Sequence, residues 1–135
     1  MAVLKNERGE SKMEFLYNAR QLQIYTIKQC TRFPKRYTFF LAQPIVQLSV
    51  QIYNNVKCGN SIYPINLYEV QMRRDYFLKA RAKLYNLISQ LEIAQEMFGI
   101  DAKHMEEWDK YIFDEIKLID GILKSDKTRY KNIES

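Results

Sequence analysis

The sequence predicts an all-α protein, an antiparallel up-down-up-down four-helix bundle. Apolar residues recur at helical spacing through most of the 135 residues, and only four Gly and three Pro interrupt them. Hydrophobic residues make up 47% of the chain and charged residues 27%, which is typical of a globular domain of this size. We expect an N-terminal extension over residues 1–11, the bundle over residues 12–124, and a frayed polar tail over residues 125–135.

The first predicted helix spans roughly residues 12–32. Ser11 and Glu14 form a Ser-x-x-Glu capping box just before the apolar run, and Phe33-Pro34 ends the helix. On a helical wheel the apolar residues of this segment fall on two opposite faces. One face carries Phe15, Ala19, Leu22 and Cys30, and the other carries Met13, Tyr17, Ile24 and Ile27.

The second predicted helix spans roughly residues 35–57 and is also two-sided. One stripe holds Tyr37, Leu41, Ile45, Leu48, Ile52 and Val56, and the opposite stripe holds Phe39, Ala42, Val46, Val50 and Tyr53. Pro44 is expected to kink this helix, because its ring removes one backbone hydrogen bond and the apolar stripe continues past it. The alternative is a true break, with Pro44 in the first turn of a new helix.

These second faces predict contact with another subunit. A helix in a monomeric bundle buries one side only, and soluble monomers rarely expose a second large apolar face. The alternative is that the extra Tyr and Val residues are scattered on the surface without such a role.

The segment Cys58–Asn66 is the sharpest break in the chain. Gly59 is expected to end the second helix by adopting a positive φ, and Pro64 cannot continue a helix. Asn66 followed by Glu69 is typical of an N-cap with a reciprocal acid. We therefore assign this hinge a structural role, with these principal residues: Asn60, Ser61, Tyr63 and Pro64.

The last two predicted helices are one-sided. The third spans residues 67–98 and ends at Gly99, and the fourth spans residues 102–124 after the N-cap Asp101. The apolar stripe of the third helix consists of Ala80, Leu84, Leu87, Leu91, Ala94 and Phe98. That of the fourth consists of Met105, Trp108, Ile112, Ile119, Ile122 and Leu123, opposite the polar residues Glu106, Lys110, Asp114, Lys117 and Lys124.

No catalytic pattern appears in the sequence. His104 has no Cys or His at ligand spacing, and the acidic pairs Glu106/Glu107 and Asp114/Glu115 are assigned to the solvated face of the fourth helix. There is no phosphate-binding loop and no nucleophile elbow. We expect no enzymatic activity, no metal and no cofactor.

The sequence predicts a cytoplasmic protein without membrane contact. The N-terminus has no apolar core of a signal peptide, and no apolar run approaches the roughly 20 residues of a membrane span. Cys30 and Cys58 are expected to be buried or half-buried thiols in a reducing compartment.

Charge is unevenly distributed along the chain, whose formal net charge is +5. Residues 1–58 hold nine Lys and Arg against three acids, whereas residues 99–124 hold four against seven. The candidate binding residues form two groups at opposite ends of the bundle: Lys28, Arg32, Lys35 and Arg36 in one, and Arg73, Arg74, Lys79, Arg81 and Lys83 in the other. Arg73 lies near the core stripe, so it needs a partner. Interleaved Tyr residues suit either a nucleic-acid surface or a protein interface, and plain solvation is the third reading.

Several segments resemble a family of small bacterial four-helix-bundle proteins. They are Val3-Leu4-Lys5 with Arg8, Ser11-Lys12 with Glu14-Phe15, the hinge Asn60–Pro64, Arg73-Arg74, Ala80-Arg81-Ala82 and Leu123–Lys127. The group is similar to the accessory variability determinant of diversity-generating retroelements and, more distantly, to proteins encoded in intervening sequences of 23S ribosomal RNA.

The resemblance implies a bundle assembled as a basic, pentameric barrel that binds the retroelement reverse transcriptase. That complex makes mutagenised complementary DNA from a template RNA, and the accessory protein is not the polymerase. The alternatives are a bundle that binds structured RNA, like the intervening-sequence proteins, and a purely structural helical oligomer.

Overall fold

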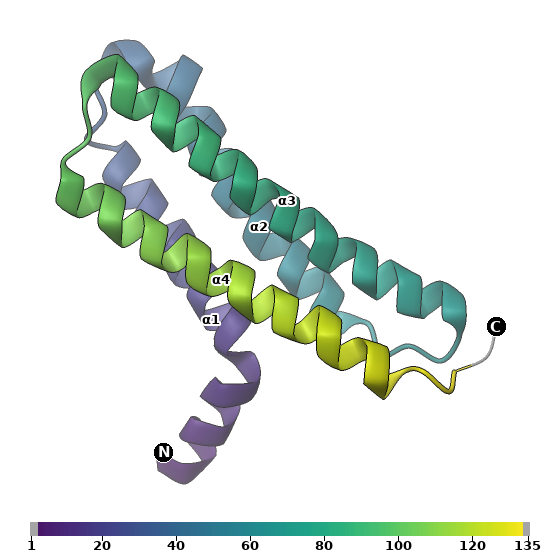
Figure 1. The fold of residues 1–135 in the computed structure, drawn as a ribbon. Helices are drawn as coiled ribbons and strands as arrows, with labels where there is room; N and C mark the ends of the chain where they lie inside the picture. Colours follow the sequence, from purple (N-terminus) through teal and green to yellow (C-terminus); the bar gives the residue numbers. More distant parts are fainter. Residues whose placement is uncertain (1–2, 134–135) are drawn as a thin grey trace.

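The computed structural model describes the backbone of residues 3–133 and the side chains of residues 13–133. Within this range the chain forms α-helices and no strands, which confirms the all-α class. The four helices are α1 (Val3–Cys30), α2 (Gln43–Ser61), α3 (Leu67–Phe98) and α4 (Ala102–Arg129). A 3-10 helix, η1 (Lys35–Tyr37), and a π-helix, η2 (Thr38–Ala42), precede α2. Helices α1 and α3 each pack against both α2 and α4 (Figure 1).

The single core is built from the predicted inner stripes. The predicted inner faces of all four helices are buried or packed against the core, and the predicted polar stripe of α4 is exposed. Sequence reasoning missed Phe77 and Ile116, which are buried, and Thr26, whose Oγ1 accepts a hydrogen bond of 3.0 Å from the Trp108 indole.

Two sets of contacts define the ends of the bundle. At one end Phe33, after α1, packs on Phe98 at the end of α3 and on Trp108 near the start of α4, with ring centroids 4.8 and 6.4 Å apart. At the other end Arg73 of α3 reaches both the end of α2 and Asp126 of α4. Residues far apart in the sequence therefore close both ends.

Helix α1 begins at Val3, not near residue 12 as predicted. Met13 has a non-helical backbone (φ −113°, ψ 16°) where two helical segments join, and Figure 1 shows the first segment leaving the bundle there. The side chain of Ser11, the predicted cap, lies outside the described side chains.

The start of α2 also differs from prediction. The α-helix begins at Gln43 with Pro44 in its first turn, but Ala42 and Gln43 have right-handed helical backbone, and η2 leads directly into α2. The chain is therefore not broken before Pro44, and the alternative of a true break is wrong, whereas the kink stays a prediction. The irregularity that accompanies Pro44 is the wider π-turn of η2 immediately before α2.

The hinge end is helical for longer than predicted. Helix α2 continues to Ser61 and Gly59 does not have a positive φ, so its predicted role as a helix terminator is wrong. Helix α4 continues to Arg129, so residues 125–129 are not a frayed tail. The bounds of α3 and both predicted N-caps are confirmed: Asn66 accepts from the Glu69 amide and Asp101 from the Lys103 amide.

Candidate nucleic-acid and partner surfaces

The first predicted basic group forms a compact exposed feature at one end of the bundle. Lys28 lies in the last turn of α1, Arg32 in the following turn, and Lys35 and Arg36 in η1, and we call these four residues the basic tip. All four are exposed, and none makes an ion pair with a described side chain. The Arg36 guanidinium lies 5.2 Å from the Tyr37 ring, which stacks on Phe98. The basic tip thus presents cations without ion-pair partners among the described side chains.

The basic tip belongs to a long stretch without acidic residues. No Asp or Glu occurs between Glu14 and Glu69, so the described part of α1 beyond Glu14 and all of α2 lack carboxylates. By contrast, α3 and α4 together hold 11 Asp and Glu residues against 11 Lys and Arg residues. Burial, together with the nearby carboxylates of Glu92 and Glu106, raises the pKa of Asp109. Charge is therefore uneven along the chain: α1 beyond Glu14 and α2 carry cations without carboxylates, whereas the positive and negative charges of α3 and α4 balance.

The second predicted basic group does not form one surface. Arg73 is only 6% exposed, and its Nε donates to Asp126 Oδ2 at 2.7 Å. Its Nη1 donates to the carbonyl oxygens of Gly59 and Ile62 at 3.1 and 3.2 Å, which satisfies the end of α2. The prediction that Arg73 needs a partner is confirmed, and its assignment to a binding surface is corrected to a structural role.

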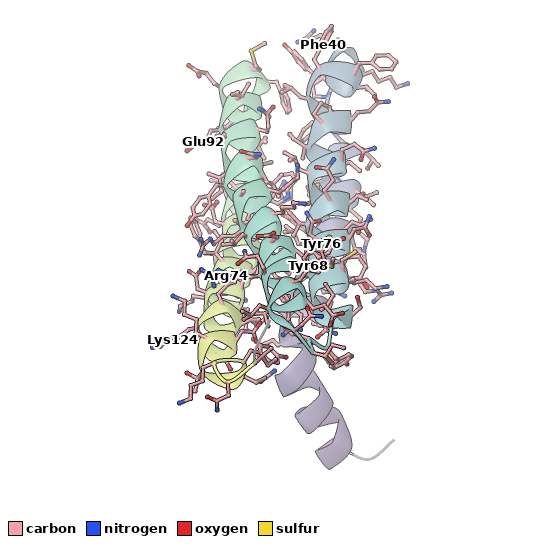
Figure 2. The ribbon with its side chains drawn as sticks, turned by 90° about the vertical axis from the view of Figure 1, so that its right-hand side faces the viewer. Phe40, Tyr68, Arg74, Tyr76, Glu92 and Lys124 are labelled. Atoms are coloured by element: carbon pink, nitrogen blue, oxygen red, sulfur yellow. The ribbon has the colours of Figure 1, made fainter. Side chains whose placement is uncertain are left out.

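The remaining members of that group have separate environments. Arg81 pairs with Asp120 at 2.6 Å on the surface, and the Lys79 ammonium lies 5.5 Å from the Tyr76 ring. Arg74 and Lys83 are half-buried. Figure 2 places Arg74 and Tyr76 on α3, toward the end of the bundle away from Phe40. Of the two predicted groups, only the basic tip has all its members exposed and without an ion pair among the described side chains.

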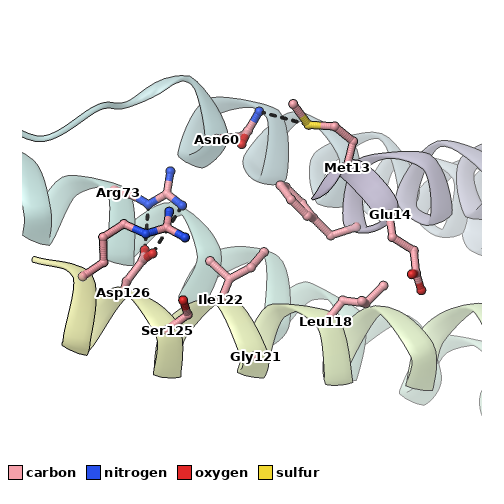
Figure 3. A pocket seen from close by; sticks show the side chains of 11 residues that line it. Met13, Glu14, Asn60, Arg73, Leu118, Gly121, Ile122, Ser125 and Asp126 are labelled. Atoms are coloured by element: carbon pink, nitrogen blue, oxygen red, sulfur yellow. Dashed lines mark hydrogen bonds and ion pairs between the residues drawn. The ribbon is translucent and has the colours of Figure 1, made fainter. Parts of the chain in front are cut away.

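A pocket of about 470 Å³ opens beside the Arg73–Asp126 pair (Figure 3). Met13 and Glu14 of α1, Asn60 of α2 and a stretch of α4 line it, and Asn60 Nδ2 donates to Met13 Sδ at 3.9 Å. The predicted hinge residues divide between helix and loop here. Asn60 and Ser61 lie in the last turn of α2, Tyr63 is 77% exposed and Pro64 is half-buried. These contacts bind the hinge to the bundle.

Glu115 is a buried acid that the sequence analysis wrongly placed on the solvated face of α4. Its side chain is 0% exposed, and its Oε1 accepts a 3.0 Å hydrogen bond from Asn18 Nδ2 of α1. Its Oε2 has no partner among the described residues. Burial, with a smaller contribution from the carboxylates of Glu14 and Asp114, raises the pKa of Glu115 to about 8 against the opposing effect of the Asn18 hydrogen bond. A carboxyl group with this pKa is mostly neutral at pH 7.

The two cysteines have opposite surroundings. Cys30 is buried, as predicted, and burial raises the pKa of its thiol to about 12, so it is unreactive at neutral pH. Cys58 is exposed, and its predicted burial is wrong because α2 turns this residue away from the core.

Two phenylalanines project beside the basic tip. Phe39 and Phe40 are 74% and 78% exposed, and both lie in η2 directly after Lys35 and Arg36 (Phe40 is labelled in Figure 2). Sequence reasoning placed Phe39 on a second apolar stripe and missed Phe40. The distribution of charged residues, which predicted the basic tip, does not indicate whether these rings are exposed.

Comparison of the chain with protein family models, with curated proteins and with solved structures gives no match. Among the residues that the structure describes, no helix combines the length and the apolar character needed to cross a bilayer.

Proposed function

We propose that this chain is a non-catalytic accessory protein of a diversity-generating retroelement. It acts in the cytoplasm, binds the reverse transcriptase of the element, and guides template RNA and complementary DNA. The observation that carries this proposal is the basic tip within the acid-free stretch between Glu14 and Glu69, because unpaired exposed cations attract phosphate backbones. The identity of the protein partner comes from the resemblance of the hinge and the neighbouring segments to the accessory variability determinant.

The proposal includes an antiparallel bundle assembled as a homo-oligomer, with a pentameric ring favoured by the resemblance. Met13, Tyr17 and Ile27 on the outer face of α1 are 43%, 60% and 41% exposed. This face carries no carboxylate beyond Glu14, whereas α3 and α4 carry exposed carboxylates such as Glu92 and Asp114. A repeated contact between unlike faces closes into a ring when the rotation allows it, and opposite charges on the two faces favour such a contact.

The proposal is tested by co-purification of the tagged chain with a reverse transcriptase encoded beside its gene. We expect a complex that survives washing and that retains template RNA. A quadruple variant with Lys28, Arg32, Lys35 and Arg36 replaced by Gln should keep the enzyme and lose RNA. The matched control replaces four exposed lysines of α4, Lys103, Lys110, Lys117 and Lys124, by Gln.

Three outcomes separate the candidate functions. Absence of a complex, with no reverse transcriptase gene nearby, would overturn the accessory role. Binding of structured RNA without the enzyme, falling steeply with salt, would favour the intervening-sequence type of function. An oligomer that binds neither would leave a structural role.

A further inference from the structure

The exposed rings of Phe39 and Phe40 stand out because both belong to the short π-helix η2. The same π-helix buries Leu41 and Ala42, which are 5% and 8% exposed, and this anchor turns the two rings outward. Covering a phenylalanine with other apolar groups stabilises a protein, so two adjacent exposed rings offer apolar area that a ligand can cover. π-Helical turns are often found at functional sites.

The chemistry around these rings favours an anionic ligand. Lys35 and Arg36 precede them in the chain, and Lys28 and Arg32 complete the same end of the bundle. The nearest acids in sequence are Glu14 and Glu69. Aromatic rings beside cations match a ligand that has both flat apolar surfaces and regularly spaced negative charges.

We infer that Phe39, Phe40 and the basic tip form a binding site for single-stranded nucleic acid, in which unpaired bases stack on the two rings while phosphates contact the cations. This inference deepens the proposed function and rests on its assignment of the basic tip to nucleic acid. Bases in a duplex are covered by their own neighbours, so exposed rings can stack only on unpaired or terminal bases. The site therefore selects single strands, such as a template RNA entering a polymerase or a newly made strand leaving it.

The test compares binding of a labelled oligouridylate with binding of an RNA duplex of equal length, at fixed salt, by fluorescence anisotropy. The variant is the double substitution Phe39→Leu/Phe40→Leu, which keeps apolar bulk and removes the aromatic faces. The control is Phe113→Leu on the acidic helix α4, where the ring is 51% exposed. Both variants alter exposed side chains, and circular dichroism checks that helicity is retained.

We expect the double variant to bind oligouridylate about tenfold more weakly, because stacking contributes about 1–3 kcal/mol per base. The double variant should bind the duplex as the parent does and show the same salt dependence of binding. The control Phe113→Leu should bind oligouridylate with the affinity of the parent. The variant Phe40→Trp should retain the affinity, and its new indole should be quenched by oligouridylate. Equal affinity of the parent and the double variant for oligouridylate, or an equal loss of affinity for duplex, would refute stacking.

Two further measurements distinguish a failure of this inference from a failure of the proposed function. Vesicles of phosphatidylserine and phosphatidylcholine test a membrane ligand, and strong vesicle binding without oligouridylate binding would overturn the inference. Co-purification of the double variant with the reverse transcriptase separates the two proposals. If the chain binds the reverse transcriptase but does not prefer single strands, the inference alone is rejected. If oligouridylate binding depends on Phe39 and Phe40 but no complex with the enzyme forms, the accessory role alone is rejected.

Discussion

Glu115 is a carboxyl group with two unequal oxygens inside the contact between α1 and α4. Oε1 accepts from Asn18, whereas Oε2 has no partner among the described groups. A buried polar atom without a hydrogen bond raises the free energy of the folded state, and a buried negative charge raises it more. The carboxyl therefore keeps its proton through neutral pH, and folding is coupled to proton binding.

Replacing Glu115 by Gln should remove this coupling. The folded pKa of about 8 exceeds the ordinary value of 4.5, so the folded state holds one proton more than the unfolded state between these pH values. The free energy of unfolding should therefore fall as pH rises through this window, by about 1.4 kcal/mol per pH unit from this group. Urea unfolding at pH 5 and pH 8 should show a gain for Glu115→Gln over the parent that grows with pH.

The exposed neighbour provides the control for this measurement. Asp114→Asn removes an adjacent charge but leaves the buried carboxyl, so it should keep most of the parent's pH dependence. A Glu115→Gln curve parallel to that of the parent would show that Glu115 does not titrate in this window.

Single-residue burial was predictable only where the helical wheel was unambiguous. Arg73 lies close to the apolar stripe of α3, so its burial and its need for a partner followed from the sequence. Glu115 was missed because α4 buries a wider arc against α1 than its apolar stripe indicates. Only the tertiary contact with Asn18 makes that position tolerable for an acid.

At the scale of elements, the crossing of α2 and α3 depends on one close approach. A Cβ at Gly59 would lie 2.8 Å from Phe77 Cε2, and Phe77 is fully buried. The absent side chain at residue 59 therefore lets the two helices approach at the hinge, and the carbonyl of the same residue accepts from Arg73. Gly59 has a packing role here.

Gly59→Ala should destabilise the protein by roughly 1–3 kcal/mol, because overpacking outweighs the gain in helix propensity. Gly121→Ala is the matched control. No atom lies within 4 Å of a Cβ at Gly121 in α4, so this change should stabilise by about 0.5–1 kcal/mol. Thermal unfolding followed by circular dichroism distinguishes the two variants. Equal shifts in the same direction would contradict the packing role.

The two ion pairs between α3 and α4 should differ in strength. The Arg73 and Asp126 side chains are 7% and 12% exposed, whereas those of Arg81 and Asp120 are 35% and 50% exposed. Asp126→Asn should cost about 3–5 kcal/mol, because it leaves a buried guanidinium without its counter-charge. Asp120→Asn should cost less than about 1 kcal/mol. Urea unfolding of both variants measures the difference, and a similar small loss in each would show that Arg73 is paired by other groups.

Helix bounds were predictable where local chemistry decides them. Asn66, Gly99 and Asp101 fix their helix ends through caps and backbone geometry within a few residues, and these ends were correct. The end of α4 was not, since residues past Lys124 stay helical where Asp126 meets Arg73, far away in sequence. The π-turn before Pro44 likewise depends on packing that no local pattern encodes.

The molecule as a whole has an unevenly covered surface. One side of α1 is in the core, and its outer face carries large apolar residues with Arg20 among them. No carboxylate follows Glu14 on α1, and none occurs on α2. The cations on these two segments therefore lack partners within their own helices. Contact with a second copy would cover the apolar residues of this face, and exposed carboxylates on α3 or α4 of that copy would pair with its cations.

Assembly through the outer face of α1 predicts a difference between two isoleucines. Ile27→Asn changes that face, and Ile65→Asn changes the hinge loop, where the side chain is 80% exposed. Both should leave each protomer folded, since neither side chain belongs to the buried core. By light scattering at micromolar concentration, the parent chain and Ile65→Asn should have the mass of an oligomer, and Ile27→Asn should shift toward the monomer. High salt should weaken assembly of the parent, because it screens the attraction between the cations near this face and the carboxylates of the second copy. A monomeric parent chain, or identical masses for the two variants, would exclude this face as the subunit contact and leave its apolar residues without an assembly role.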